Sequence, residues 1–199
     1  MASVIDTKEE LIMPERRALF AGGTKLVLSA TAVALLVGQE KLALAASADP
    51  AKDVSILNVA LGLEQEAINA YQIGAESGLL KKPALDVAVL FQSQHKEHAA
   101  ALEATIKKLG GTAVTAKSQA DYAKALGAGG LKTGEDVLKL AAKLEKGAAN
   151  AYLGVIPSFT DPALSQISGR IAADEAFHYT ALILTLGEAL PQKALSFGA

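Results

Sequence analysis

The 199-residue sequence contains no cysteine, and that absence excludes whole classes of metal chemistry. An iron–sulfur cluster or a four-cysteine iron site needs thiolate ligands, so the chain holds neither, and it has no electron-donor site of that kind. A domain of this length can build a core without disulfides, so the lack of cysteine leaves the cellular compartment open.

Aromatic residues are also scarce, at 5% of the sequence, although 51% of the residues are hydrophobic. The apolar content is therefore mostly alanine and leucine. This favours helices, because strands are rich in aromatic and β-branched residues. The formal net charge is −2, so the chain has no excess of basic residues with which to bind nucleic acid. The composition predicts an all-α protein that does not bind DNA or RNA.

The start of the chain has the pattern of an export signal. Arg16 and Arg17 precede an apolar run over residues 26–37, and a small-x-small cleavage pattern ends at Ala45. The arginine pair resembles a twin-arginine signal, which directs a protein to export in the folded state. A membrane-anchoring or amphipathic helix is the alternative, but a run of about 12 apolar residues falls short of the roughly 20 that span a bilayer. We therefore expect a signal peptide over the first 45 residues and a periplasmic or otherwise exported domain over residues 46–199, with no stable membrane span.

Four apolar stripes with helical spacing follow this signal, and glycine or proline separates them. Each stripe predicts one helix, and the predicted ranges are 52–77, 83–110, 133–156 and 161–187. The first and last connections are short, whereas residues 111–133 form a long connector with room for a short helix at 119–126. Two helical hairpins joined by a long crossover are typical of an antiparallel four-helix bundle.

The two predicted hairpins repeat each other in sequence. The corresponding residues, at offsets of 80 or 81, are Glu64 and Glu145, Tyr71 and Tyr152, His95 and Glu175, and His98 and His178. All three histidines of the chain belong to this repeated set. The repeat indicates a duplicated hairpin in which the first helix supplies a carboxylate and the second supplies a pair of ligands.

Each predicted helix places ionisable or imidazole groups on its apolar face. Burial of an unpaired carboxylate costs several kcal/mol, so these side chains need a partner or a metal ion. Lysine partners are the structural alternative, but the nearby lysines fall at helix ends or in loops. Residues three apart share one helical face, so the two residues of each ligand pair can act together. The predicted metal ligands are Glu64, His95, His98, Glu145, Glu175 and His178.

This ordered set resembles the ferritin-like superfamily, whose site takes one Glu from each of two helices and Glu-x-x-His from each of the other two. The resemblance covers residues 50–190 and is to secreted bacterial ferritin-like proteins related to rubrerythrin and bacterioferritin. It implies a dinuclear site for Fe or Mn, with Zn a further option, because mixed carboxylate and imidazole ligands suit these metals. Ferritin-like domains that bind no metal exist as a class, and that alternative stays open.

His95 departs from the family pattern, because it stands where the family has a Glu that usually bridges the two metals. A neutral imidazole binds a single metal through one nitrogen. We therefore expect either that Glu175 is the only helix-borne bridge, or that one metal binds tightly and a second weakly. With His95 assigned to the Glu64 side, the position formed by Glu145, Glu175 and His178 is predicted to bind its metal more tightly.

Tyr71 and Tyr152 lie about two turns beyond Glu64 and Glu145 on the same helical faces. Three interpretations are open for them. They are ordinary core aromatics, partners that hydrogen-bond the ligand carboxylates, or redox-active tyrosines.

The resemblance implies redox chemistry with oxygen or peroxide at the metals, of the ferroxidase or oxidase kind. A non-catalytic metal-binding protein and a stress-protective bundle whose metal only stabilises the fold are the alternatives. The sequence does not decide whether the protein is an enzyme. It also leaves the electron donor and the assembly open, and a homodimer is one possibility.

Overall fold

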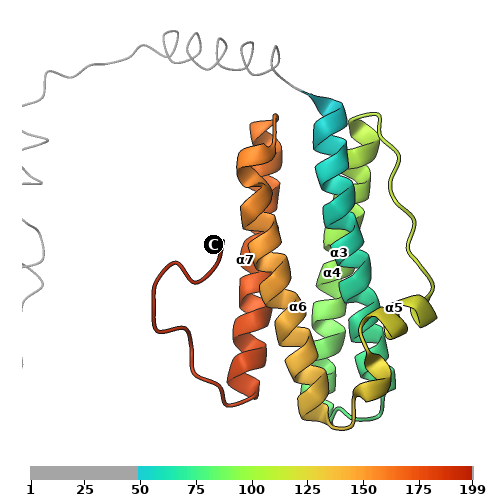
Figure 1. Ribbon diagram of the computed structural model, residues 1–199, viewed down its shortest axis with the longest axis vertical. Coiled ribbons are helices and arrows are strands. Elements are labelled where there is room, and N and C mark those ends of the chain that lie inside the picture. Colours follow the sequence, from blue (N-terminus) through green and yellow to red (C-terminus); the bar gives the residue numbers. More distant parts are fainter. Residues whose placement is uncertain (1–48, 199) are drawn as a thin grey trace, which may run out of the picture. The chain divides into compact units, whose positions relative to one another are not determined.

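The computed structural model describes residues 49–198, and the predicted export signal lies outside this range. Over these residues the chain forms helices and no strand (Figure 1). The four long helices are α3 Pro50–Glu76, α4 Lys82–Lys108, α6 Gly134–Val155 and α7 Pro162–Thr185. The connections hold the short helix α5 Gln119–Ala125 and two 3-10 turns, η1 Ala128–Gly130 and η2 Ile156–Ser158. None of the described helices is long and apolar enough to cross a membrane.

The ends of the long helices fall within two residues of the predicted ends, because capping residues, proline and glycine mark them. The Asp49 side chain caps α3 by accepting a hydrogen bond of 3.0 Å from the Lys52 backbone N–H. At the start of α6, Thr133 and Asp136 form a reciprocal capping box. Gly78 follows α3 with φ of 70°, a left-handed conformation that a side chain would strain.

The long connector crosses from one end of the bundle to the other along the outside of α3 and α4 (Figure 1). Asn58 on α3 holds it at two points, donating to the Thr112 carbonyl at 3.0 Å and accepting from the Val114 N–H at 2.8 Å. Gln65 donates to the Val114 carbonyl at 3.0 Å. This crossover lets α6 begin at the end of the bundle where α3 ends, so the predicted pair of hairpins is the observed architecture.

The apolar core consists of two clusters with a polar layer between them. One cluster gathers around Leu61, Leu102 and Ile106, and the other around Phe91 and Leu182. Along each long helix the buried glutamates and histidines fall between the two clusters in sequence. Full burial of one such leucine or phenylalanine contributes about 1.5–3 kcal/mol, so the clusters provide the stability that offsets burying charge in the middle.

Asp53 is a buried carboxylate that the sequence analysis did not single out. It is 1% exposed and accepts hydrogen bonds from the backbone N–H of Thr160 at 2.9 Å, from its hydroxyl at 2.7 Å and from the Asp161 N–H at 3.2 Å. These bonds join the start of α3 to the turn before α7. Asp53 therefore ties the two hairpins together at one end of the bundle.

Candidate metal centre

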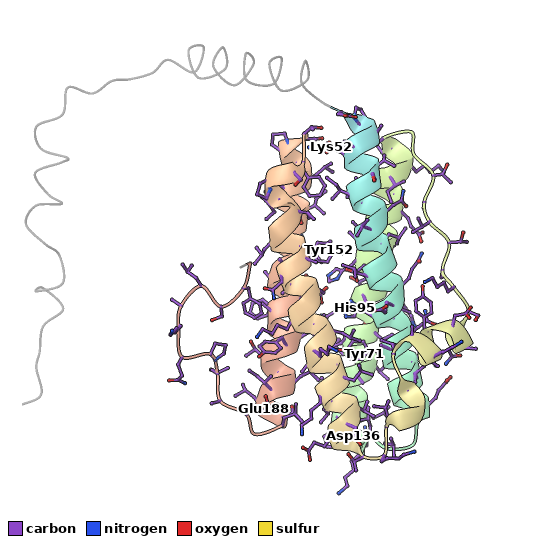
Figure 2. The ribbon with its side chains drawn as sticks, viewed as in Figure 1. Lys52, Tyr71, His95, Asp136, Tyr152 and Glu188 are labelled. Carbon is purple, nitrogen blue, oxygen red and sulfur yellow. The ribbon has the colours of Figure 1, made fainter. Side chains whose placement is uncertain are left out.

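The structure brings the six predicted ligand residues together in the middle of the bundle. Five of them are at most 2% exposed, and the side chain of His98 is 11% exposed. Figure 2 shows His95 between the two hairpins, at a level between Tyr152 and Tyr71. The apolar periodicity that identified these residues therefore also predicted which way their side chains point.

The ligand atoms form two groups, and within each group they lie within 4.8 Å of one another. The first group is Glu64, His95, His98 and Glu175, and the second is His95, Glu145, Glu175 and His178. His95 and Glu175 belong to both groups. Each group thus has one glutamate and one histidine of its own and shares the other two side chains.

His95 lies between the two unshared glutamates. Its Nδ1 is 2.8 Å from Oε2 of Glu64, and its Nε2 is 3.2 Å from Oε1 of Glu145. The sequence assigned His95 to the Glu64 side alone, and the structure corrects that assignment. The repeat cannot show this, because a spacing along one helix does not tell how far a ring reaches between two hairpins.

Glu175 also faces both ligand groups, with one carboxylate oxygen toward each of the two unshared histidines. These are His98 and His178, the outer histidines. Oε1 of Glu175 is 3.1 Å from Nδ1 of His98, and its Oε2 is 3.4 Å from Nδ1 of His178. Both Glu175 oxygens and Nδ1 of His98 are buried without a hydrogen-bond partner. A buried carboxylate left this way is costly unless a cation satisfies it. These oxygen and nitrogen donors fit a first-row transition metal.

The outer histidines are held from behind by two residues that the sequence analysis missed. Nε2 of His98 is 3.2 Å from Oδ2 of Asp174, and Nε2 of His178 is 2.7 Å from Oε1 of Gln94. Both oxygens accept, so each Nε2 carries a proton and each Nδ1 can offer a lone pair to the centre. Gln94 and Asp174 correspond at the same offset of 80, so the repeat itself contained the signal.

The two tyrosines bond across the hairpins. The Tyr71 hydroxyl on α3 donates to Glu145 on α6, and the Tyr152 hydroxyl on α6 donates to Glu64 on α3. Burial and the neighbouring carboxylates raise the pKa of both tyrosines, which keeps the hydroxyls protonated as donors. Of the interpretations of Tyr71 and Tyr152, the structure supports the role of hydrogen-bond partner, and both rings are also part of the core.

Two opposing effects set the pKa values of the ligand residues: burial disfavours their charged forms, and pairing with the opposite charge favours them. Burial lowers the pKa of His95, but Glu145 and Glu64 outweigh burial and raise the pKa to about 10. Burial raises the pKa of Glu64, yet hydrogen bonds from His95 and His98 bring it below its ordinary value. Burial also raises the pKa of Glu175, and here the histidines do not compensate. Without a metal, protonated histidines therefore balance the carboxylates.

Comparison with known proteins identifies the family and the fold. Residues 52–188 match the family described as Ferritin-like domain. The fold is similar to a conserved hypothetical protein from Mycobacterium tuberculosis, with a TM-score of 0.59 and 21% identity over 72% of this chain and 96% of that one. It is also similar to a dodecameric thioferritin, the bacterioferritin-related protein from Bacteroides fragilis, with a TM-score of 0.61 and 19% identity over 72% of this chain and 89% of that one. No curated protein matches the sequence.

Proposed function

Because the chain belongs to the ferritin-like domain family, we propose that its buried centre holds two Fe or Mn ions and uses them to reduce oxygen or peroxide. The observation that supports this most is the set of three buried polar atoms without a hydrogen-bond partner, which are both oxygens of the shared Glu175 and Nδ1 of His98 in the first group. Burying these atoms without a hydrogen-bond partner destabilises the bundle, and a bound cation would remove that cost. Zn would fit the same donors without redox activity.

Each of the two ions would be held by one unshared glutamate, one unshared histidine and the shared pair. Two such ions, when bound, supply electrons to oxygen or peroxide. Tyr71 and Tyr152 orient the unshared glutamates, and Gln94 and Asp174 orient the outer histidines. The apolar clusters on both sides exclude water from the layer between them.

Oxygen uptake tests this function directly. Metal-free protein is loaded with Fe(II) under anaerobic conditions, and uptake is followed with an oxygen electrode after air is admitted. We expect uptake at least about 10-fold faster than that of free Fe(II) at the same concentration, because held ions react in a fixed geometry. Glu175→Gln should lose this gain, since it removes the shared carboxylate. Uptake no faster than free Fe(II) would contradict the redox function.

The matched control for this experiment is Glu97→Gln. Glu97 is an exposed carboxylate on α4 next to His98, and it belongs to neither ligand group. This variant removes the same charge from the same helix. It should keep the uptake of the natural protein.

A non-catalytic metal-binding protein is the second candidate, and the hydrogen bonds around the unshared glutamates favour it. Glu64 and Glu145 each accept from a tyrosine and from His95 without any metal. Most of the centre therefore keeps its place when metal leaves, which suits reversible loading. Tight retention of two ions with no oxygen uptake above free Fe(II) would select this function.

We further propose that the protein is exported, which the arginine pair and the short apolar run support. Residues 1–46 fused to a reporter protein should direct it out of the cytoplasm. Replacing Arg16 and Arg17 together by lysine should abolish this export, because a twin-arginine pathway reads the pair. Unchanged export by the lysine variant would contradict the twin-arginine assignment.

A further inference from the structure

We infer that His95 bridges the two metal ions through both ring nitrogens, in the place where related sites have a bridging glutamate. This inference rests on the proposed function, because it needs both ions to bind. It differs from the expectation that Glu175 alone bridges. A histidine that binds through one nitrogen cannot bridge two ions, so both ring nitrogens of His95 are needed.

The position of the ring supports this role. Nδ1 and Nε2 point to opposite sides, 2.8 Å and 3.2 Å from the carboxylates of Glu64 and Glu145. The ring is 1% exposed, and Tyr71 packs against it with ring centroids 5.5 Å apart. The contacts on both edges and over one face hold the ring with Nδ1 toward Glu64 and Nε2 toward Glu145. Each nitrogen therefore faces the unshared glutamate of a different ligand group.

Glu175 has the same two-sided placement on the opposing helix. Its two oxygens face His98 and His178, one on each side. The repeat relates His95 to Glu175 at an offset of 80, so the two bridging positions are equivalent in the duplicated fold. Two bridges then join two positions that each have one further glutamate and one further histidine.

The charge balance of the centre agrees with a bridging imidazole. Three carboxylates alone leave two divalent ions with one uncompensated positive charge in a buried site. When each nitrogen of His95 binds an ion, the ring gives up both N–H protons to solvent and becomes an imidazolate. Three carboxylates and one imidazolate then carry four negative charges, which equal the charge of two divalent ions. No oxidation or reduction is involved.

The distance between the two ions tests the bridge. Two metal–nitrogen bonds of about 2 Å on either side of the ring separate the ions by about 6 Å, whereas carboxylate bridges alone give about 3.5–4 Å. We would determine the crystal structure of the natural protein loaded with Zn²⁺. We expect two ions about 6 Å apart, with Nδ1 of His95 on one and Nε2 on the other.

His95→Glu is the comparison variant, because it restores the glutamate of related sites. Its two ions are expected to move to about 3.5–4 Å apart. If this variant does not fold, the structure of the natural protein decides alone. Natural protein with two ions 3.5–4 Å apart, or with His95 bound to one ion only, overturns the bridge and leaves the proposed function standing. Natural protein with no ion at the six residues overturns the proposed function itself.

Discussion

At the scale of single residues, each tyrosine hydroxyl gives a buried hydrogen bond to a glutamate that the neighbouring histidines keep ionised. We predict that Tyr152→Phe destabilises the metal-free protein by about 1–3 kcal/mol, because Glu64 loses a buried donor while the ring stays in place. Urea unfolding of chelator-treated protein measures this. Tyr122→Phe is the control, since Tyr122 is buried away from the centre and accepts only a long bond of 3.3 Å from Lys117. Equal losses in both variants would show that the carboxylate contact is unimportant.

The hydrogen-bond partners of the outer histidines His98 and His178 differ in charge, and this difference gives a second prediction. Asp174 offers a carboxylate to His98, whereas Gln94 offers an amide to His178. Removing such an outer partner typically weakens metal affinity about 10–100-fold. We expect Asp174→Asn to weaken one of two Zn²⁺ binding steps by about 10-fold, as measured by calorimetric titration. Glu97→Gln should leave both steps unchanged, and a uniform loss at both steps in Asp174→Asn would contradict the assignment to one position.

The sequence predicted the six central residues because burial of charge on an apolar face is visible in helical periodicity. It could not predict partners that depend on how the hairpins pack. Tyr71 bonds the glutamate of the other hairpin, and His95 reaches both sides. Asp174 and Gln94 correspond in the repeat, but the sequence does not show that each contacts a histidine of the other hairpin.

At the scale of the elements, the helices were predictable because proline, glycine and capping residues end them. The contacts between elements were not. Asp53 lies within the first turn of α3, where an acidic residue is favourable in any helix, so its role at the turn before α7 is hidden from the sequence. The path of the crossover likewise depends on Asn58 and Gln65, which have no distinctive spacing.

We predict that Asp53→Ala destabilises the protein by about 3 kcal/mol, because three donors at Thr160 and Asp161 lose a charged acceptor. Asp49→Ala removes only an exposed cap of the same helix and should cost about 1 kcal/mol. Chemical unfolding of both variants measures the difference. If Asp53→Ala costs no more than Asp49→Ala, Asp53 does not join the hairpins.

At the scale of the whole molecule, the buried charges link stability to pH in opposite ways with and without metal. The pKa values of His95 and His98 are raised from 6.5 to about 10, so their stabilisation is complete below about pH 6.5 and is lost as the pH rises toward 10. The lowered pKa of Glu64 adds stability above about pH 4.5, which is lost on acidification. The raised pKa of Glu175 also disfavours the folded state as the pH rises.

The metal-free protein is therefore expected to be most stable between about pH 4.5 and 6.5 and to weaken from there toward pH 10. The stabilisation by added Zn²⁺ should instead grow with pH over the same alkaline range, because protons compete with the ion for the histidines. Thermal unfolding with and without Zn²⁺ at several pH values checks both trends. Parallel trends in the two forms would contradict the idea that protons and metal ions occupy the same groups.

The central claim is that the shared and unshared ligands hold two ions in each chain, and a count of bound metal tests it most directly. Metal-free protein is incubated with Mn²⁺ or Zn²⁺, passed through a desalting column and analysed for metal per chain. We predict two ions for the natural protein and for Glu97→Gln, and a loss of metal in Glu175→Gln, Glu145→Gln and His178→Ala. Retention of no metal by the natural protein, or of the same amount by Glu175→Gln, would contradict the central claim.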